Sequence, residues 1–437
     1  MTVLAADWVL PVDAPPIERG AVALENGRIQ EVGPIAELGP ADETYDGAAI
    51  FPGFVNAHSH LEYAVYAGFG DGLDFGPWLM THVSRKRHVD WDGHVAIARA
   101  GVAASLAGGI TATADASFTG AAAVACAELG LRAIVHLEVF GHDAQRVADF
   151  HEKRARIEKS LGPLVRLGVS PHAPYTVSPE LYEACDALGL PVATHLAESE
   201  AEQLWVSSGT GPWAEYAHLL VAPYGTTAIR KLAEVGVLHE RVTAAHCVQA
   251  DDDEIGLLAE HDVAVAHCPR SNAILGCGIA PLRGLIAAGV RGGIGTDSPA
   301  STPSIDMFEE LRTAVYMARV RERRGDALLS SEALELATLG SARALGLEHE
   351  LGSLTPGKRA DLAVVSLSGS PYLPWEDPAA GVVFGGAPHR VLLTVVEGEV
   401  RYENGVTEWQ ELIDAAASVR ERMLAGASQP HVLQELV

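Results

Sequence analysis

The chain of 437 residues contains few basic residues, few aromatic residues and few cysteines. Its 31 Lys and Arg stand against 57 Asp and Glu, for a net charge of −26. This charge argues against binding to nucleic acid or to an anionic membrane, because both require a basic surface. The five cysteines include no C-x-x-C pair, so we expect free, buried thiols in a reducing compartment.

Long apolar runs are also missing. No run approaches the roughly 18 residues that a membrane-spanning helix needs. The first residues, MTVLAADWVLPVD, have no basic stretch before an apolar core, so we expect no signal peptide. Together these absences predict a cytoplasmic protein.

A β-rich pattern is present at both ends of the chain. Residues 1–50 alternate short apolar segments with turns such as Asn-Gly, and a similar pattern returns over residues 355–410. We therefore expect the two ends to form one small β-sandwich domain, with residues 51–354 inserted between its halves. Residues 407–437 predict a C-terminal helical tail.

Between the two ends, short apolar runs alternate with helix-length segments. The eight runs are FVNAHSH (54–60), ITATADA (110–116), RAIVHLEVF (132–140), VRLGVSPHA (165–173), PVATHLAE (191–198), VTAAHCV (242–248), VAVAHCP (263–269) and VRGGIGTDS (290–298). Two neighbouring runs could belong to an open sheet, but eight β-α units over roughly 300 residues favour an α/β fold of the (β/α)8 TIM barrel type.

Polar, titratable residues stand at the ends of these runs. They are His58 and His60, His172, His195 with Glu198, His246 and Asp297. One histidine at a strand end is more often a hydrogen-bonded core residue than a ligand, and His-x-His often occurs by accident. Here the strand ends of a barrel meet at one rim, and residues two apart on a strand share a face, so the set favours a functional site.

Three imidazoles and one carboxylate suit a mononuclear site for Zn²⁺, although Fe²⁺ or another divalent transition metal would also fit. We expect His58, His60, His195 and Asp297 to hold one such ion per chain. Glu198 is placed to take a proton from the attacking water and pass it on, and His246 to hydrogen-bond that water or the developing oxyanion. Glu198, His246 and Asp297 are therefore the expected catalytic residues, in a hydrolytic attack on an electron-poor sp² carbon.

The ordered motifs resemble the amidohydrolase superfamily, in its branch of aromatic-heterocycle deaminases. The matching segments cover nearly the whole chain and are PGFVNAHSH, SPHAPYTVSPEL, THLAESEAE, AAHCV, HCPRSNAILGCGIAPL, GTDSPAS and GSLTPGKRADLAVV. The resemblance implies a distorted barrel with one Zn²⁺ and a β-sandwich built from both chain ends. Binuclear members use a carboxylated lysine from the fourth strand, and no lysine stands there in this chain.

Within that branch, HAPYTVS followed by HLAESEAE is similar to the deaminases of methylthioadenosine, S-adenosylhomocysteine, 5′-deoxyadenosine and aminofutalosine. The resemblance implies release of ammonia from a small-molecule substrate, a 6-aminopurine nucleoside derivative. It also implies that His172 contacts the substrate and that Glu198 acts at N1 of the purine. A homodimer would be ordinary for this group.

One departure from the family pattern concerns the ribose. Relatives that act on adenosines commonly carry a ribose-binding Glu just before a Trp, and this chain has Pro77 before Trp78. Either Glu62 or Asp74 takes over that contact, or the substrate is another N-heterocycle such as a guanine-like base, a pterin or an s-triazine. Glu62 is therefore a candidate substrate-binding residue. Trp78 and Arg270 are two more, although a helix that covers the barrel mouth would also place Trp78 there, and the CPRSN segment around Arg270 could equally pack beneath the site.

Overall fold

Eight parallel strands form the larger of two sheets in the computed structural model, which describes residues 1–427. In sheet order these strands are β12 (Arg291–Ile294), β11 (Ala264–His267), β10 (Val242–His246), β9 (Val192–Leu196), β8 (Val165–Pro171), β7 (Arg132–Val139), β6 (Ile110–Ser117) and β5 (Phe54–Ser59). Most are buried along their whole length, as expected where helices cover a parallel sheet. The sheet confirms the predicted distorted (β/α)8 barrel.

The barrel closes between its first strand and the segment that follows its last strand. Ser59 and Asp297 form an isolated parallel bridge, and the Asp297 amide donates to the His58 carbonyl over 3.0 Å. The closure therefore brings the backbones of two predicted metal ligands together.

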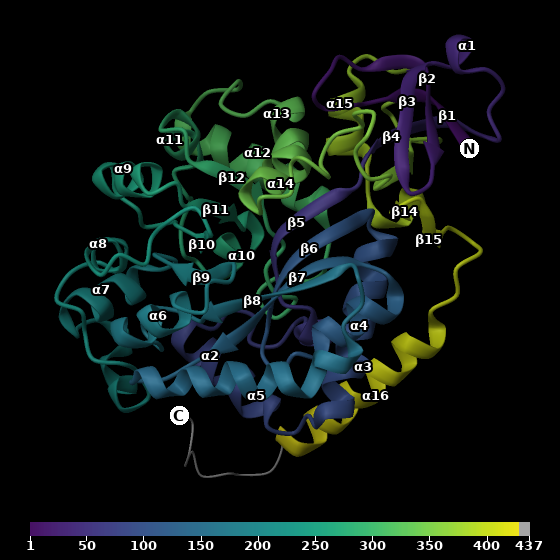
Figure 1. Ribbon diagram of the computed structural model, residues 1–437. Helices are drawn as coiled ribbons and strands as arrows, with labels where there is room; N and C mark the ends of the chain where they lie inside the picture. The colour runs from purple at the N-terminus through teal and green to yellow at the C-terminus, as the bar shows by residue number, and fades with distance from the viewer. Residues whose placement is uncertain (428–437) are drawn as a thin grey trace.

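Helices connect successive strands and lie around the barrel (Figure 1). They are α3 (Trp91–Ala107), α4 (Ala121–Leu129), α5 (Ala148–Ile157), α6 (Pro179–Asp186), α7 (Glu200–Ser208), α8 (Ala228–Glu234), α9 (Asp252–Glu260), α10 (Pro269–Ile274), α11 (Leu282–Ala287), α12 (Met307–Glu322) and α13 (Ser330–Glu335). Several begin at side-chain caps: Asp90 accepts from the Gly93 amide before α3, and Asp251 forms a capping box with Glu254 before α9.

The second sheet has seven strands and is built from both ends of the chain. Their order is β15 (Glu399–Glu403), β14 (Val391–Val396), β13 (Leu362–Ser366), β4 (Glu43–Pro52), β1 (Thr2–Val9), β2 (Ile17–Glu25) and β3 (Arg28–Pro34). Along β1, Leu4 and Ala6 pack on one face, whereas Val3 and Ala5 pack on the other. The predicted division into domains of residues 1–50 with 355–410 and residues 51–354 stays a prediction.

The two sheets are joined where β4 leads into β5. Only Gly53 lies between these strands, and a Cβ atom at that position would lie 2.1 Å from the Thr111 side chain, so the close approach requires glycine. Phe51 and Phe54, on either side of it, pack ring to ring at 4.9 Å. An ion pair between Arg132 and Asp361 adds a polar link between the two sheets.

Helix α16 (Gln410–Ala427) follows the second sheet and packs against α3 and against α2 (Phe75–Lys86) (Figure 1). It lies within the predicted tail, of which residues 428–437 lie outside the described residues. Over the described part of the chain, no helix combines the length and the hydropathy that a membrane span requires.

Candidate metal centre

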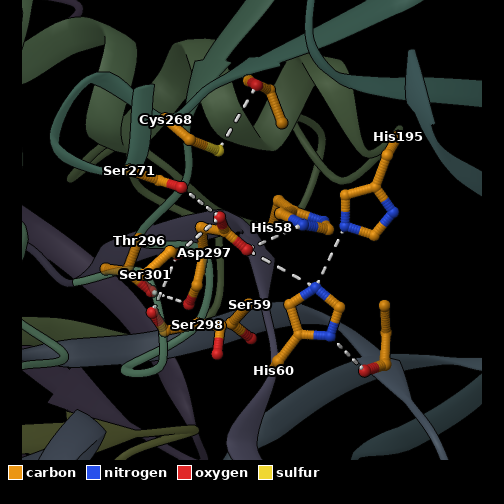
Figure 2. Close-up of polar contacts among 12 residues, drawn as sticks. His58, Ser59, His60, His195, Cys268, Ser271, Thr296, Asp297, Ser298 and Ser301 are labelled. Carbon is orange, nitrogen blue, oxygen red and sulfur yellow. Dashed lines mark hydrogen bonds and ion pairs between the residues drawn. The ribbon is translucent and has the colours of Figure 1, made fainter. Parts of the chain in front are cut away.

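The four predicted ligands come together at the carboxyl ends of the barrel strands (Figure 2). His58 lies in β5, His60 directly follows it, His195 lies in β9 and Asp297 follows β12. One ligand atom from each lies within 4.8 Å of the others, and all four side chains are buried. The structure therefore brings together residues that are up to 239 positions apart in the sequence.

Backbone carbonyls determine which ring nitrogens face the centre. The Nδ1 of His60 lies 2.9 Å from the Ala116 carbonyl, and the Nδ1 of His195 lies 2.9 Å from the His172 carbonyl. Because a carbonyl only accepts, each Nδ1 must carry the proton. The two Nε2 lone pairs then face each other across 3.2 Å, an arrangement that is repulsive without a cation between them.

The spacing of the ligand atoms suits a small tetrahedral ion. With zinc–ligand bonds of about 2.0–2.1 Å, two ligands of a tetrahedral site lie about 3.4 Å apart. The Nε2 atoms of His58 and His60 each lie 3.5 Å from Asp297 Oδ1, close to that value. His58 Nε2 also has no hydrogen-bond partner, although it is buried. The donor set therefore fits Zn²⁺.

Hydrogen bonds hold Asp297 in position. The hydroxyls of Ser271 and Ser301 donate to Oδ2 at 2.5 and 2.9 Å, which leaves Oδ1 to face the histidines (Figure 2). Burial alone would raise the pKa of this carboxyl, but the nearby His58 and the other neighbouring imidazoles hold its pKa well below the usual range. The residue also has a φ of 54°, a strained value of the kind often found at functional sites.

Glu198 and His246 lie beside the four predicted ligands. Glu198 Oε1 is 3.7 Å from His246 Nε2, and both residues belong with Asp297 to a second compact group of ligand-type atoms. Burial, followed by the charges of Asp297 and Glu202, raises the pKa of Glu198 well above its usual range. The Nδ1 of His246 is bonded to Asn272 Oδ1 at 2.9 Å, so the ring has a fixed orientation.

A cavity of about 470 Å³ opens from this centre, which is a size typical of small-molecule sites. His60, His195, Glu198 and Asp297 line its floor, and Trp78 of α2 lines it from the side of the barrel mouth. His172 also lines the cavity, with its Nδ1 bonded to Thr176 Oγ1 at 2.8 Å.

Two predicted substrate-binding residues do not line this cavity. The Glu62 carboxylate accepts from Thr119 Oγ1 at 2.9 Å and from Ser117. Arg270 is buried, and its guanidinium pairs with Glu310 at 2.5 Å and Glu309 at 2.7 Å. Hydrogen bonds within the protein wall already satisfy the Glu62 carboxylate, and the charge of Arg270 is matched there by two glutamates. Asp74, the other residue considered for the ribose, is the N-cap of α2 and is also absent from the cavity wall.

Other cavity residues were not singled out from the sequence as ligand-binding groups. Two of them are Lys86 at the end of α2 and Lys153 on α5. Both lie in basic helical segments whose pattern alone indicates an ordinary solvated helix face.

The sequence from residue 49 to 401 matches the family model described as Amidohydrolase family. The chain belongs to the amidohydrolase family, as the fold and the four-residue centre indicate. It is 33% identical to the 5′-deoxyadenosine deaminase of Methanothermobacter thermautotrophicus, over 93% of this chain and 96% of that protein.

Two further proteins extend the likeness. The 5-methylthioadenosine/S-adenosylhomocysteine deaminase of Moorella thermoacetica is 32% identical, over 96% of this chain and 98% of the relative. Among solved structures, a zinc-bound adenosine deaminase from Xanthomonas campestris superposes with a TM-score of 0.85 at 30% identity, covering 97% and 98% of the two chains. The predicted family and branch are thus confirmed.

Proposed function

We propose that this protein is a zinc-dependent deaminase that hydrolyses a 5′-modified adenosine and releases ammonia. The observation that carries the proposal is the set of inward-facing Nε2 and carboxylate atoms, with the buried carboxyl of Glu198 beside it. The named activities of the full-length relatives support the same substrate class.

Zinc, when bound by His58, His60, His195 and Asp297, supplies a Lewis acid that makes water a nucleophile at neutral pH. Glu198 takes a proton from the attacking water and gives it to N1 of the purine while the new C–O bond forms at C6. The same carboxyl then moves the second water proton to the amino group. The C–N bond breaks, ammonia leaves, and the product carries a 6-oxo group.

His246 and His172 position the reacting groups. The His246 Nε2, held beside Glu198, hydrogen-bonds the attacking water and the oxygen on which charge develops. His172 faces the cavity, and the centroid of its ring lies 4.8 Å from the centroid of the His195 ring. It is therefore placed to contact the substrate next to the reacting carbon.

A panel of candidate substrates tests this proposal. Ammonia release is measured with methylthioadenosine, S-adenosylhomocysteine, 5′-deoxyadenosine and adenosine, and with guanine, a pterin and an s-triazine for comparison. The proposal expects turnover of at least one adenosine derivative. Turnover of another heterocycle alone would favour the alternative, which rests on Pro77 and on the absence of Glu62 and Asp74 from the cavity wall.

The cytoplasmic location and a homodimer belong to the same proposal. The free cysteines support a reducing compartment, and all five are buried. Light scattering after size-exclusion chromatography measures the mass of the assembly, and a mass of one chain, about 46.0 kDa, would contradict the dimer.

A further inference from the structure

Glu202 of α7 is a buried carboxylate that does not line the cavity. Its side chain is only 1% exposed. Glu310, another buried glutamate, is paired with Arg270, whereas no basic side chain of the described residues pairs with Glu202. Because a buried charge is costly unless other groups compensate it, the groups that contact Glu202 indicate what it does.

Two backbone amides contact the Glu202 carboxylate. The Ala197 amide donates to Oε1 at 3.0 Å, and the Glu198 amide donates to Oε2 at 2.7 Å. Burial raises the pKa of Glu202 to about 7, and the hydrogen bonds from these amides oppose that rise. Hydrogen bonds of this kind are strongest when the acceptor is ionised. Both carboxylate oxygens are therefore bound to the turn that carries Glu198.

An ordinary helix cap does not account for these two bonds. Helix α9 shows the ordinary arrangement, in which Glu254 accepts from the amide of its own N-cap residue, Asp251, over 3.1 Å. Helix α7 has the same spacing, and the hydroxyl of its N-cap residue, Ser199, accepts from the Glu202 amide over 3.1 Å. The Glu202 carboxylate, however, reaches one and two residues further back than the N-cap. It therefore holds the turn between β9 and α7, and not the helix end alone.

This turn contains a conformation that its sequence does not favour. Ala197 has a φ of 51°, in the left-handed region that residues other than glycine rarely adopt. Along a regular strand, side chains three positions apart, such as those of His195 and Glu198, would point to opposite faces. The left-handed residue interrupts that alternation, and both side chains line the cavity. Glu198 Oε1 consequently lies 3.7 Å from His246 Nε2.

We propose that Glu202 is a positioning residue: its carboxylate holds the left-handed turn at Ala197 and thereby places the Glu198 carboxyl beside the metal centre. The inference rests on the proposed function, because it concerns the residue to which that function assigns the proton transfers. Glu202 lies outside the cavity wall and acts only through the turn. Its effect should therefore fall on the chemical step more than on substrate binding.

Replacement of Glu202 by Gln tests this role. The amide keeps the shape of the side chain but offers one acceptor oxygen, and its NH₂ group then faces one of the two backbone donors. We expect kcat on the best adenosine derivative to fall by about 10–100-fold, with KM within about twofold, because a misplacement of about 1 Å can cost about 10²-fold in rate. Bound zinc should stay at the wild-type level.

Glu200→Gln is the matched control. Glu200 is exposed and lies in the first turn of the same helix, so the same chemical change there should leave kcat and KM as in the wild type. A Glu202→Gln variant with the kcat of the wild type, or one in which only KM changes, would overturn the positioning role.

A second substitution, Ala197→Gly, distinguishes positioning from a general loss of stability. Glycine adopts a positive φ without strain, so a turn with glycine at this position depends less on Glu202. The double variant Glu202→Gln/Ala197→Gly should therefore recover kcat to within about threefold of the wild type. A double variant no faster than Glu202→Gln would overturn the role. If Glu202→Gln does not fold, the double variant decides: folding with Glu198 beside His246 supports the role, and failure to fold overturns it.

Crystal structures of the wild type and of Glu202→Gln separate this role from the proposed function. If no adenosine derivative is deaminated, the proposed function fails, and the structures then decide on Glu202 without any activity. Displacement of the Glu198 carboxyl by about 1 Å or more relative to His246, with Ala197 outside the left-handed region, supports the role. An unchanged turn and an unchanged Glu198 overturn it.

Discussion

Replacement of Glu198 by Gln should remove most of the turnover while the metal site stays intact. The side chain is 3% exposed, Gln has nearly the same shape, and all four proposed metal ligands are retained. An amide cannot accept a proton and return it, so the variant loses the proposed proton transfers. General acid–base catalysis contributes about 10²–10⁴-fold. We therefore expect kcat to fall by a factor in that range, which corresponds to a barrier increase of about 3–5 kcal/mol.

The same substitution should not weaken the fold. Burial and the charges of Asp297 and Glu202 raise the pKa of Glu198, which means that its ionised form is unfavourable in the folded protein. Gln keeps the shape of the side chain and has no ionisable group in this buried site. An unfolding temperature at or above that of the wild type, together with lost turnover, would distinguish a catalytic defect from misfolding.

Three measurements are compared for this variant: kcat and KM on the best adenosine derivative, zinc per chain, and the unfolding temperature. Glu200→Gln is the matched control, because Glu200 is exposed and stands only two positions further along the chain. Its kinetics should match those of the wild type. A Glu198→Gln variant with kcat within twofold of the wild type, or one that has lost its zinc, would refute the role given to Glu198.

Arg270→Met should cost about 3–5 kcal/mol of stability, because it leaves the buried Glu310 without its partner. Urea unfolding measures this loss. A changed KM without a loss of stability would instead indicate that Arg270 binds the substrate. Burial raises the pKa of Glu202 from 4.5 to about 7, so the folded state holds this proton more tightly than the unfolded state does. Relative to Glu202→Gln, the wild type should therefore lose up to about 3 kcal/mol of its free energy of unfolding as the pH rises from about 4.5 through 7. A difference in the free energy of unfolding between the two proteins that does not change with pH would contradict this. Ser271→Ala removes a hydrogen bond to Asp297 and should weaken zinc binding by about 10–100-fold in a chelator competition, whereas unchanged affinity would show that Ser301 holds the carboxylate alone.

The barrel and its metal centre could be predicted from the sequence because their signals are local. Each strand is a short apolar run, and β6 (Ile110–Ser117) and β9 (Val192–Leu196) fall within a residue or two of runs 110–116 and 191–198. A barrel then places all strand ends at one rim, so residues at those ends meet without any knowledge of loop conformation. His58 and His195 follow directly from that geometry.

The cavity wall could not be predicted in the same way, because it depends on partners far apart in the sequence. Arg270 looks like a free cation until α12 brings Glu310 against it, 40 residues later. Glu62 is adjacent to the metal ligands in sequence, yet hydrogen bonds from residues about 55 positions away hold it in the wall. Lys86 and Lys153 enter the cavity through the packing of α2 and α5, which no strand pattern specifies.

The most direct test of the account is a zinc titration of the metal-free protein, with deaminase activity and bound metal measured at each step. We expect activity on an adenosine derivative to rise in proportion to bound zinc and to reach its plateau at one equivalent per chain. Full activity in the metal-free protein, or a plateau only at two equivalents, would contradict a single ion held by His58, His60, His195 and Asp297.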